Sequence, residues 1–167
     1  MIQNWADLIH NGDKLGEFFT SIPPLEQVLL RSVHFSRFGP TVILRLDLPR
    51  FPDRPLPEWV ERGCDRLQCH VRFLAVDNVS MRRWEPPVVA DVQLTPLERR
   101  RIKVRVASDQ TSLEFTSSDS LTVGRVSAFR SPGCGPDRVR HYYAGKMDSR
   151  KYECVPNAEA ATYYEQF

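Results

Sequence analysis

Cationic side chains recur at alternate positions in two segments of the sequence, residues 66–73 and residues 101–107. Alternate positions of a β-strand project from the same face, so each segment would present a row of positive charge if it formed a strand. Residues 62–105 carry ten Lys or Arg against five Asp or Glu. If the two strands share a sheet, the rows form one basic strip, which would speed association with an acidic partner and fix its orientation. The predicted strip consists of Arg66, His70, Arg72, Arg101, Lys103 and Arg105.

The partner of this strip could be a protein or a nucleic acid. Sheets that bind nucleic acid stack bases on aromatic side chains, and the polar faces of the two segments carry none. The formal net charge of the whole chain is only +2, which does not by itself indicate a nucleic-acid binder. We therefore expect an acidic protein surface as the partner, with a basic sheet-based module for nucleic acid as the alternative. A charged face that only keeps the protein soluble would show the same pattern.

A second candidate surface is the proline-rich segment Pro49–Pro57. Its four prolines predict a rigid, extended loop without strand pairing. A rigid loop loses little entropy on binding, and Phe51 and Leu56 could serve as apolar anchors beside Arg54. This loop competes with the basic strip as the partner-binding site.

Catalytic patterns are not found in the sequence. It contains no G-x-S-x-G, no glycine-rich phosphate loop and no H-E-x-x-H. Its four histidines fall on unrelated segments, and an ion pair accounts for Arg45 and Asp47 on one face of a predicted strand. We expect no catalytic residue, no metal ligand set and no cofactor, and therefore a protein that is not an enzyme.

The four cysteines, Cys64, Cys69, Cys134 and Cys154, are predicted to be free thiols. Their spacing matches neither a zinc ribbon nor a C-x-x-C redox pair. The first residues, MIQNWADLIHNGD, lack the basic and apolar regions of a signal peptide. The longest apolar run, residues 73–76, is too short to cross a membrane. We expect a cytoplasmic protein with reduced thiols and no membrane association.

The elements that would position these side chains follow from the apolar spacing. Leu15, Phe18, Phe19 and Ile22 repeat at helical spacing, whereas alternation with a period of two begins near residue 28. A further single helical turn is predicted from Pro57 to Gly63, and Gly124 predicts a β-bulge. Short connections favour pairing between neighbouring strands. The predicted strands are residues 28–35, 41–48, 66–73, 79–84, 88–94, 101–107, 112–116 and 121–129.

These elements predict an α+β fold, a mainly antiparallel sheet of about six to eight strands with short N-terminal helices packed on one face. The 167 residues suit one domain of this kind. A composition break follows residue 130, because all five tyrosines come after it and all three tryptophans before it. We expect a domain over residues 1–130 and a tyrosine-rich extension over residues 131–167 that docks on it.

The order of several short motifs resembles that of the immunity protein 50 family over residues 3–130. The motifs are Trp5, Asn11-Gly12-Asp13, Phe18-Phe19, Pro23-Pro24-Leu25-Glu26, Gly39-Pro40-Thr41-Val42, Leu46-Asp47-Leu48-Pro49, Phe51-Pro52, Pro57-x-Trp59, Gly63, Leu67-Gln68, Phe73 and Trp84.

This resemblance implies a small non-enzymatic protein, encoded beside a toxin gene, that binds and neutralises that bacterial polymorphic toxin. The matching residues are turn glycines, loop prolines and core aromatics, so the resemblance transfers no binding site and names no toxin. An immunity protein without a signal peptide would meet its toxin in the cytoplasm. That location favours a nuclease, a deaminase or another cytoplasmic enzyme as the target over a cell-wall hydrolase.

Overall fold

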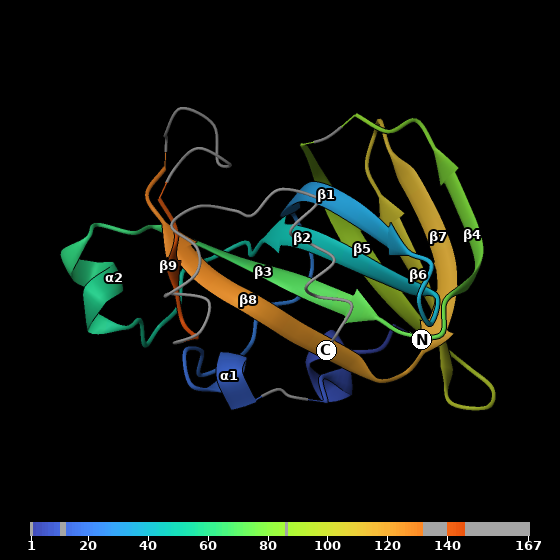
Figure 1. The fold of residues 1–167 in the computed structure, drawn as a ribbon, viewed down its shortest axis with the longest axis horizontal. Coiled ribbons are helices and arrows are strands. Elements are labelled where there is room, and N and C mark those ends of the chain that lie inside the picture. The colour runs from blue at the N-terminus through green and yellow to red at the C-terminus, as the bar shows by residue number, and fades with distance from the viewer. Residues whose placement is uncertain (1, 11–12, 86, 132–139, 146–167) are drawn as a thin grey trace.

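One antiparallel sheet of nine strands dominates the structure (Figure 1). The computed structural model describes residues 2–10, 13–85, 87–131 and 140–145. In spatial order the strands are β4 (Asp77–Arg82), β7 (Ser112–Ser118), β6 (Arg101–Ala107), β5 (Val88–Leu97), β1 (Val28–Ser36), β2 (Thr41–Asp47), β3 (Arg66–Phe73), β8 (Leu121–Phe129) and β9 (Tyr142–Tyr143).

The period-two pattern of the sequence produces this sheet. In β6, Ile102, Val104 and Val106 are buried, while the alternating cationic positions face solvent to a greater extent. The predicted bounds of β3, β6 and β8 agree with the structure. The predicted bulge is also present, because β8 places two residues, Arg125 and Val126, opposite the single residue Cys69 of β3. The prediction of about six to eight strands falls short of the nine observed.

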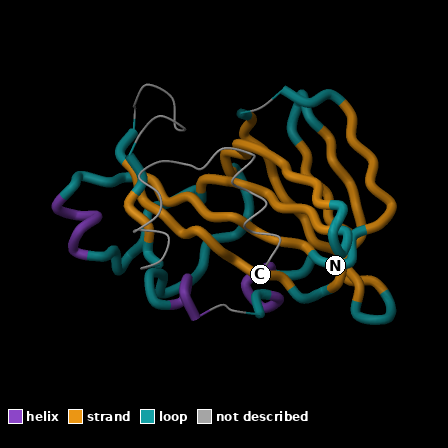
Figure 2. Tube along the Cα trace, in the orientation of Figure 1, coloured by secondary structure: helices purple, strands orange, loops and turns teal. Residues whose placement is uncertain are grey.

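The sheet curls until its two halves face each other, as Figures 1 and 2 show. One half consists of β4, β7, β6 and β5, and the other consists of β1, β2, β3 and β8. Five strands separate β3 from β4 in the sheet, although only residues 74–76 connect them along the chain. At about 4.8 Å per strand, a flat sheet would place them about 29 Å apart. A connection of four Cα–Cα steps spans at most about 15 Å. The curl therefore follows from the connectivity. The predicted pairing between strands that are consecutive in the chain is wrong for β3–β4, β4–β5 and β7–β8.

The apolar core fills the space between the two halves of the curled sheet. The ring of Phe73 in β3 lies 5.1 Å from that of Phe115 in β7, centroid to centroid, in an edge-on arrangement. Both rings are buried. The two halves meet along β1 and β5, which share only the three pairs from Val28–Ala90 to Leu30–Val88. One core cluster joins residues of both halves.

The predicted N-terminal helices packed on one face of the sheet are wrong. The structure has a 3-10 turn, η1 (Trp5–Leu8), capped by Asn4, and a single helical turn, α1 (Asp13–Gly16). Beyond α1, the backbone N–H of Thr20 donates to the Asp53 carboxylate, and the Phe18 carbonyl accepts from Arg54 N–H. These long-range bonds use the groups that a longer helix would need. The helical spacing of the apolar residues reflects core packing instead, since Leu15, Phe18 and Phe19 are all buried.

The proline-rich segment is followed by the predicted single turn, α2 (Pro57–Glu61), after which Gly63 adopts a φ of 68°. Trp59 of α2 is fully buried, and its indole N–H donates to the carbonyl of Tyr142 at 3.0 Å. Of the expected C-terminal extension, Ser131 and residues 140–145 are described, and β9 pairs with β8. Docking of the whole extension stays a prediction. Within the described part of the chain, no helix is long and apolar enough to span a membrane.

Replacing Phe73 with Ala should lower the free energy of unfolding by about 3–5 kcal/mol, because the truncation leaves a cavity between the two halves. Chemical denaturation measures the loss. Phe35→Ala is the matched control, since the Phe35 side chain is 45% exposed, and it should cost about 1 kcal/mol or less. Equal losses in the two variants would contradict a core that lies between the halves.

Candidate partner-binding surfaces

The three cationic residues of β6 lie on the outer face of the β5–β6–β7–β4 half and are paired with carboxylates. The Arg101 guanidinium lies 2.9 Å from the Asp77 carboxylate. Lys103 and Arg105 flank Glu114 of β7, each at 3.4 Å. The side chains of Lys103, Arg105 and Glu114 are 49%, 58% and 35% exposed. Exposed pairs of this kind contribute about 0–1 kcal/mol, so competing carboxylates can displace Glu114 at little cost.

The three predicted residues of β3 lie in two different environments. Arg66 is exposed at the start of the strand, close to Ser131. His70 and Arg72 lie half-buried on the outer face of the β1–β2–β3–β8 half. Strands β5, β1 and β2 separate β3 from β6. The structure therefore brings the predicted residues together as two groups of three, one on each half of the sheet, and not on neighbouring strands.

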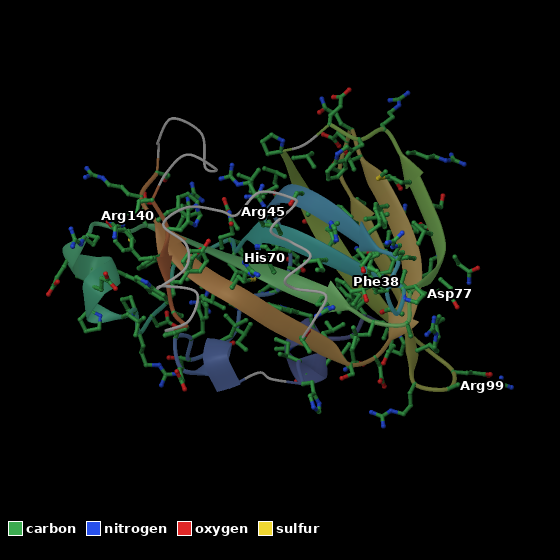
Figure 3. The ribbon with its side chains drawn as sticks, in the orientation of Figure 1. Phe38, Arg45, His70, Asp77, Arg99 and Arg140 are labelled. Carbon is green, nitrogen blue, oxygen red and sulfur yellow. The ribbon has the colours of Figure 1, made fainter. Side chains whose placement is uncertain are left out.

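The outer face around His70 is a polar surface that sequence reasoning largely missed. Arg45 is directly opposite His70 in the sheet register, and Figure 3 shows the two residues on the same part of the face. Arg45 and Arg125 are both buried despite their charge. The Arg45 Nε donates to the Ser32 hydroxyl at 3.1 Å. The only sequence signal for this surface is the run of arginines and histidines at alternate positions of strands that the structure places side by side.

An ion pair between Arg31 and Asp47 anchors this polar face. Arg31 is the extra residue of a β-bulge in β1, and its Nη2 lies 2.6 Å from the Asp47 carboxylate. The Gln68 amide donates to the other carboxylate oxygen at 2.9 Å. The predicted ion pair between Arg45 and Asp47 is wrong. The bulge in β1 places Arg31 beside the Asp47 carboxylate, and the Arg45 Nε bonds to Ser32 instead. A bulge in β1 leaves no mark in the alternation of β2, which is the pattern used for that prediction.

Burial and neighbouring charges shift two pKa values on the sheet. Desolvation, followed by the charges of Arg45 and Arg125 and the neighbouring His141, lowers the pKa of His70 to about 3. His70 is therefore neutral at physiological pH. Burial, together with the smaller effect of the Asp47 charge, raises the pKa of the Cys69 thiol to about 12. Burial also raises the pKa of Cys64, so neither thiol forms a reactive thiolate near pH 7.

The competing loop directs its predicted anchors inward. The ring of Phe51 lies 6.4 Å from that of Trp59 in an edge-on contact. Leu56 packs against the core and immediately precedes α2. The Arg54 guanidinium donates to the backbone carbonyls of Gly16 and Phe19 at 2.7 and 2.9 Å. Arg54 holds the loop on the N-terminal segment, and Phe51 and Leu56 pack inward, so all three side chains have a structural use.

The described cysteines, Cys64 and Cys69, are free thiols, while Cys134 and Cys154 lie outside the described residues. Over residues 2–10, 13–85, 87–131 and 140–145, no group of three or more His, Cys, Asp or Glu side chains is arranged to hold a metal ion.

Acidification should destabilise the fold through His70. Its pKa is about 3 in the folded protein and about 6.5 when unfolded, so the unfolded state binds a proton first as the pH falls. The stabilising contribution is complete above pH 6.5 and is lost between pH 6.5 and 3. Between pH 7 and pH 5 the free energy of unfolding should fall by about 2 kcal/mol more in the wild-type protein than in His70→Gln. Parallel denaturation curves at the two pH values measure this difference, and identical pH dependence would contradict a desolvated His70.

The comparison with family models gives a match to immunity protein 50 over residues 11–128. No curated protein and no solved structure matches the chain. The matched region runs from the α1 segment through β7 and covers nearly all of β8, so it includes both outer faces and the proline-rich loop. It also agrees with the resemblance found from the order of short motifs. The chain belongs to the immunity protein 50 family.

Proposed function

We propose that this protein binds and neutralises a cognate polymorphic toxin of the same bacterium, without catalysing a reaction itself. The observation that supports the proposal is the family match over residues 11–128. The region that the family model matches holds nearly all of the sheet, including both of its outer faces. A toxin can be inactivated by covering its active site or substrate groove. A stable complex of this kind needs about 800 Å² from each partner.

The outer face of the β5–β6–β7–β4 half is the proposed contact with acidic groups of the toxin. Arg101, Lys103 and Arg105 lie in line along β6, and Gln93 and Thr95 of β5 flank them in the sheet register. Their ion pairs with Asp77 and Glu114 are at least partly exposed, so toxin carboxylates can join or replace them. Such contacts mainly increase the association rate and fix the orientation of the complex. Of the three predicted residues on β3, Arg66 is the most accessible to solvent.

We propose the cytoplasm as the place of action, where the toxin would attack a cytoplasmic substrate. Free Cys64 and Cys69 suit a reducing compartment, in which thiols stay unpaired. A nuclease or a deaminase is the kind of target that suits this location. The alternative function, a basic module for nucleic acid, differs in one measurable property. Its affinity for generic DNA would fall steeply as the salt concentration rises.

Co-expression tests the proposed function directly. The toxin domain encoded beside the gene for this protein should arrest growth when expressed alone, and this protein should restore growth and form a saturable one-to-one complex with it. Salt-dependent binding to generic DNA without rescue would instead support the alternative module. If the neighbouring gene encodes no toxin and no rescue occurs, the immunity proposal fails.

Arg105→Glu should slow association with the same toxin domain by about tenfold at low salt, because reversing one interface charge changes the electrostatic attraction between the partners. Stopped-flow or surface-based kinetics measure the rate constant. Arg130→Glu makes the same charge change at an exposed position after β8 and is the matched control. Equal association rates for the two variants would show that the β6 cations, Arg101, Lys103 and Arg105, do not contact the toxin.

A further inference from the structure

We infer that the toxin is held at one end of the curled sheet, by Phe38 as an apolar anchor and by arginines around it. This inference rests on the proposed function and names the surface and the partner chemistry: an apolar pocket on the toxin rimmed by carboxylates. The surface, called the loop end here, consists of four connections. They are residues 37–40 between β1 and β2, residues 74–76 between β3 and β4, residues 98–100 between β5 and β6, and residues 119–120 between β7 and β8.

Backbone and side-chain hydrogen bonds fasten these four connections together. The Val76 N–H donates to the Pro40 carbonyl at 2.9 Å, and the Arg101 guanidinium donates to the Ala75 carbonyl at 2.8 Å. The Asp119 N–H donates to the Arg100 carbonyl at 3.0 Å. Figure 3 shows Phe38, Asp77 and Arg99 at this same end of the molecule. The loop end is therefore one connected surface on a rigid support, which reduces the entropy lost on binding.

Phe38 has the properties of a binding anchor. Its side chain is 57% exposed, although an aromatic ring of this size is normally buried. The Arg37 guanidinium lies 4.9 Å from the ring centroid, in a cation–π contact. The turn around it is well ordered by hydrogen bonds, since the Phe38 N–H donates to the Ser36 hydroxyl and Thr41 donates to the Gly39 carbonyl. Aromatic and arginine side chains dominate the binding energy of protein interfaces.

The β5–β6 turn supplies a second, independent observation. Arg99 and Arg100 are consecutive residues with φ of 58° each. Residues other than Gly and Asn rarely adopt this left-handed backbone conformation. Tight hairpin turns that need positive φ therefore favour the sequence Asn-Gly. Both arginines are exposed. Strained residues cluster at functional sites, and here the turn presents two arginine side chains to solvent.

The charges of the loop end favour an acidic partner. Arg101 is paired with Asp77, and Arg100 lies 3.4 Å from Asp119. Arg37 and Arg99 have no carboxylate partner among the described residues, and Glu98 is the one exposed carboxylate of the four connections outside these pairs. Carboxylates on the toxin can therefore pair with Arg37 and Arg99 while an apolar pocket receives Phe38. The loop end also continues directly into the cationic row of β6 at Arg101.

The first test truncates the anchor and measures binding to the toxin domain encoded by the neighbouring gene. Phe38→Ala should raise the dissociation constant by about 30-fold or more, as truncation of a dominant interface residue does. Val60→Ala is the matched control, because Val60 in α2 is 62% exposed and lies away from the loop end. It should leave the dissociation constant unchanged.

The second test separates a functional turn from a merely strained one. The double variant Arg99→Asn/Arg100→Gly relieves the backbone strain and removes both charges, so it should raise the melting temperature while weakening toxin binding by about tenfold. Arg83→Gly is the control, since Arg83 is an exposed arginine with a φ of 51° after the opposite end of β4. It should leave binding unchanged.

The outcomes distinguish this inference from the proposed function. If the wild-type protein binds the toxin and both loop-end variants bind equally well, the inference is overturned and the proposed function stands. If Phe38→Ala disrupts only self-association of this chain, the surface is a contact between two copies and the inference is likewise overturned. If the wild-type protein forms no complex with the toxin, the proposed function fails and the inference fails with it.

Discussion

The three-residue connection between β3 and β4 is the constraint on which the rest of the structure depends. It joins two strands that five others separate in the sheet, so the sheet must curl until they approach. Ala75 takes a left-handed φ of 51°, and Val76 bonds to Pro40, which directs the chain from one half of the sheet to the other. The same curl brings Phe73 against Phe115 and closes one core between the halves.

The curl also gives the two outer faces different characters. On the β1–β2–β3–β8 half, Arg45 and Asp47 are buried; Arg45 bonds to Ser32, and Asp47 bonds to Arg31 and Gln68. On the β5–β6–β7–β4 half, the ion pairs around Glu114 are exposed and weak. The first face holds its charges in contacts within the sheet, whereas the second leaves them exposed to solvent. In the sequence, cationic residues at alternate strand positions look the same on both faces, so the alternation does not distinguish buried charges from exposed ones.

Local patterns predicted the strands well and their arrangement poorly. The alternation of Ile102, Val104 and Val106 sets the position of β6 because one face of that strand is buried along its whole length. The partner of β4 depends instead on how residues 74–76 turn, which no alternation encodes. The N-terminal helices failed for a similar reason, since the backbone of Phe18 and Thr20 bonds to a loop more than thirty residues away. The predicted strip assumed that β3 and β6 were close, and their separation became visible only with the strand order.

The connection at residues 74–76 has a consequence for how the chain folds. Strands β5, β6 and β7 form a meander of neighbours that can assemble from local contacts, and β1 and β2 form a hairpin. Strand β4 can pair only after β7 has been made, and β8 pairs with β3 only after the four strands between them along the chain, β4 to β7, have been made. Contacts of such large sequence separation carry a loop-closure entropy that is lost before they stabilise anything, which places proteins of this type among the slow folders. The time needed to close this sheet therefore sets how soon a newly made chain presents its folded surfaces.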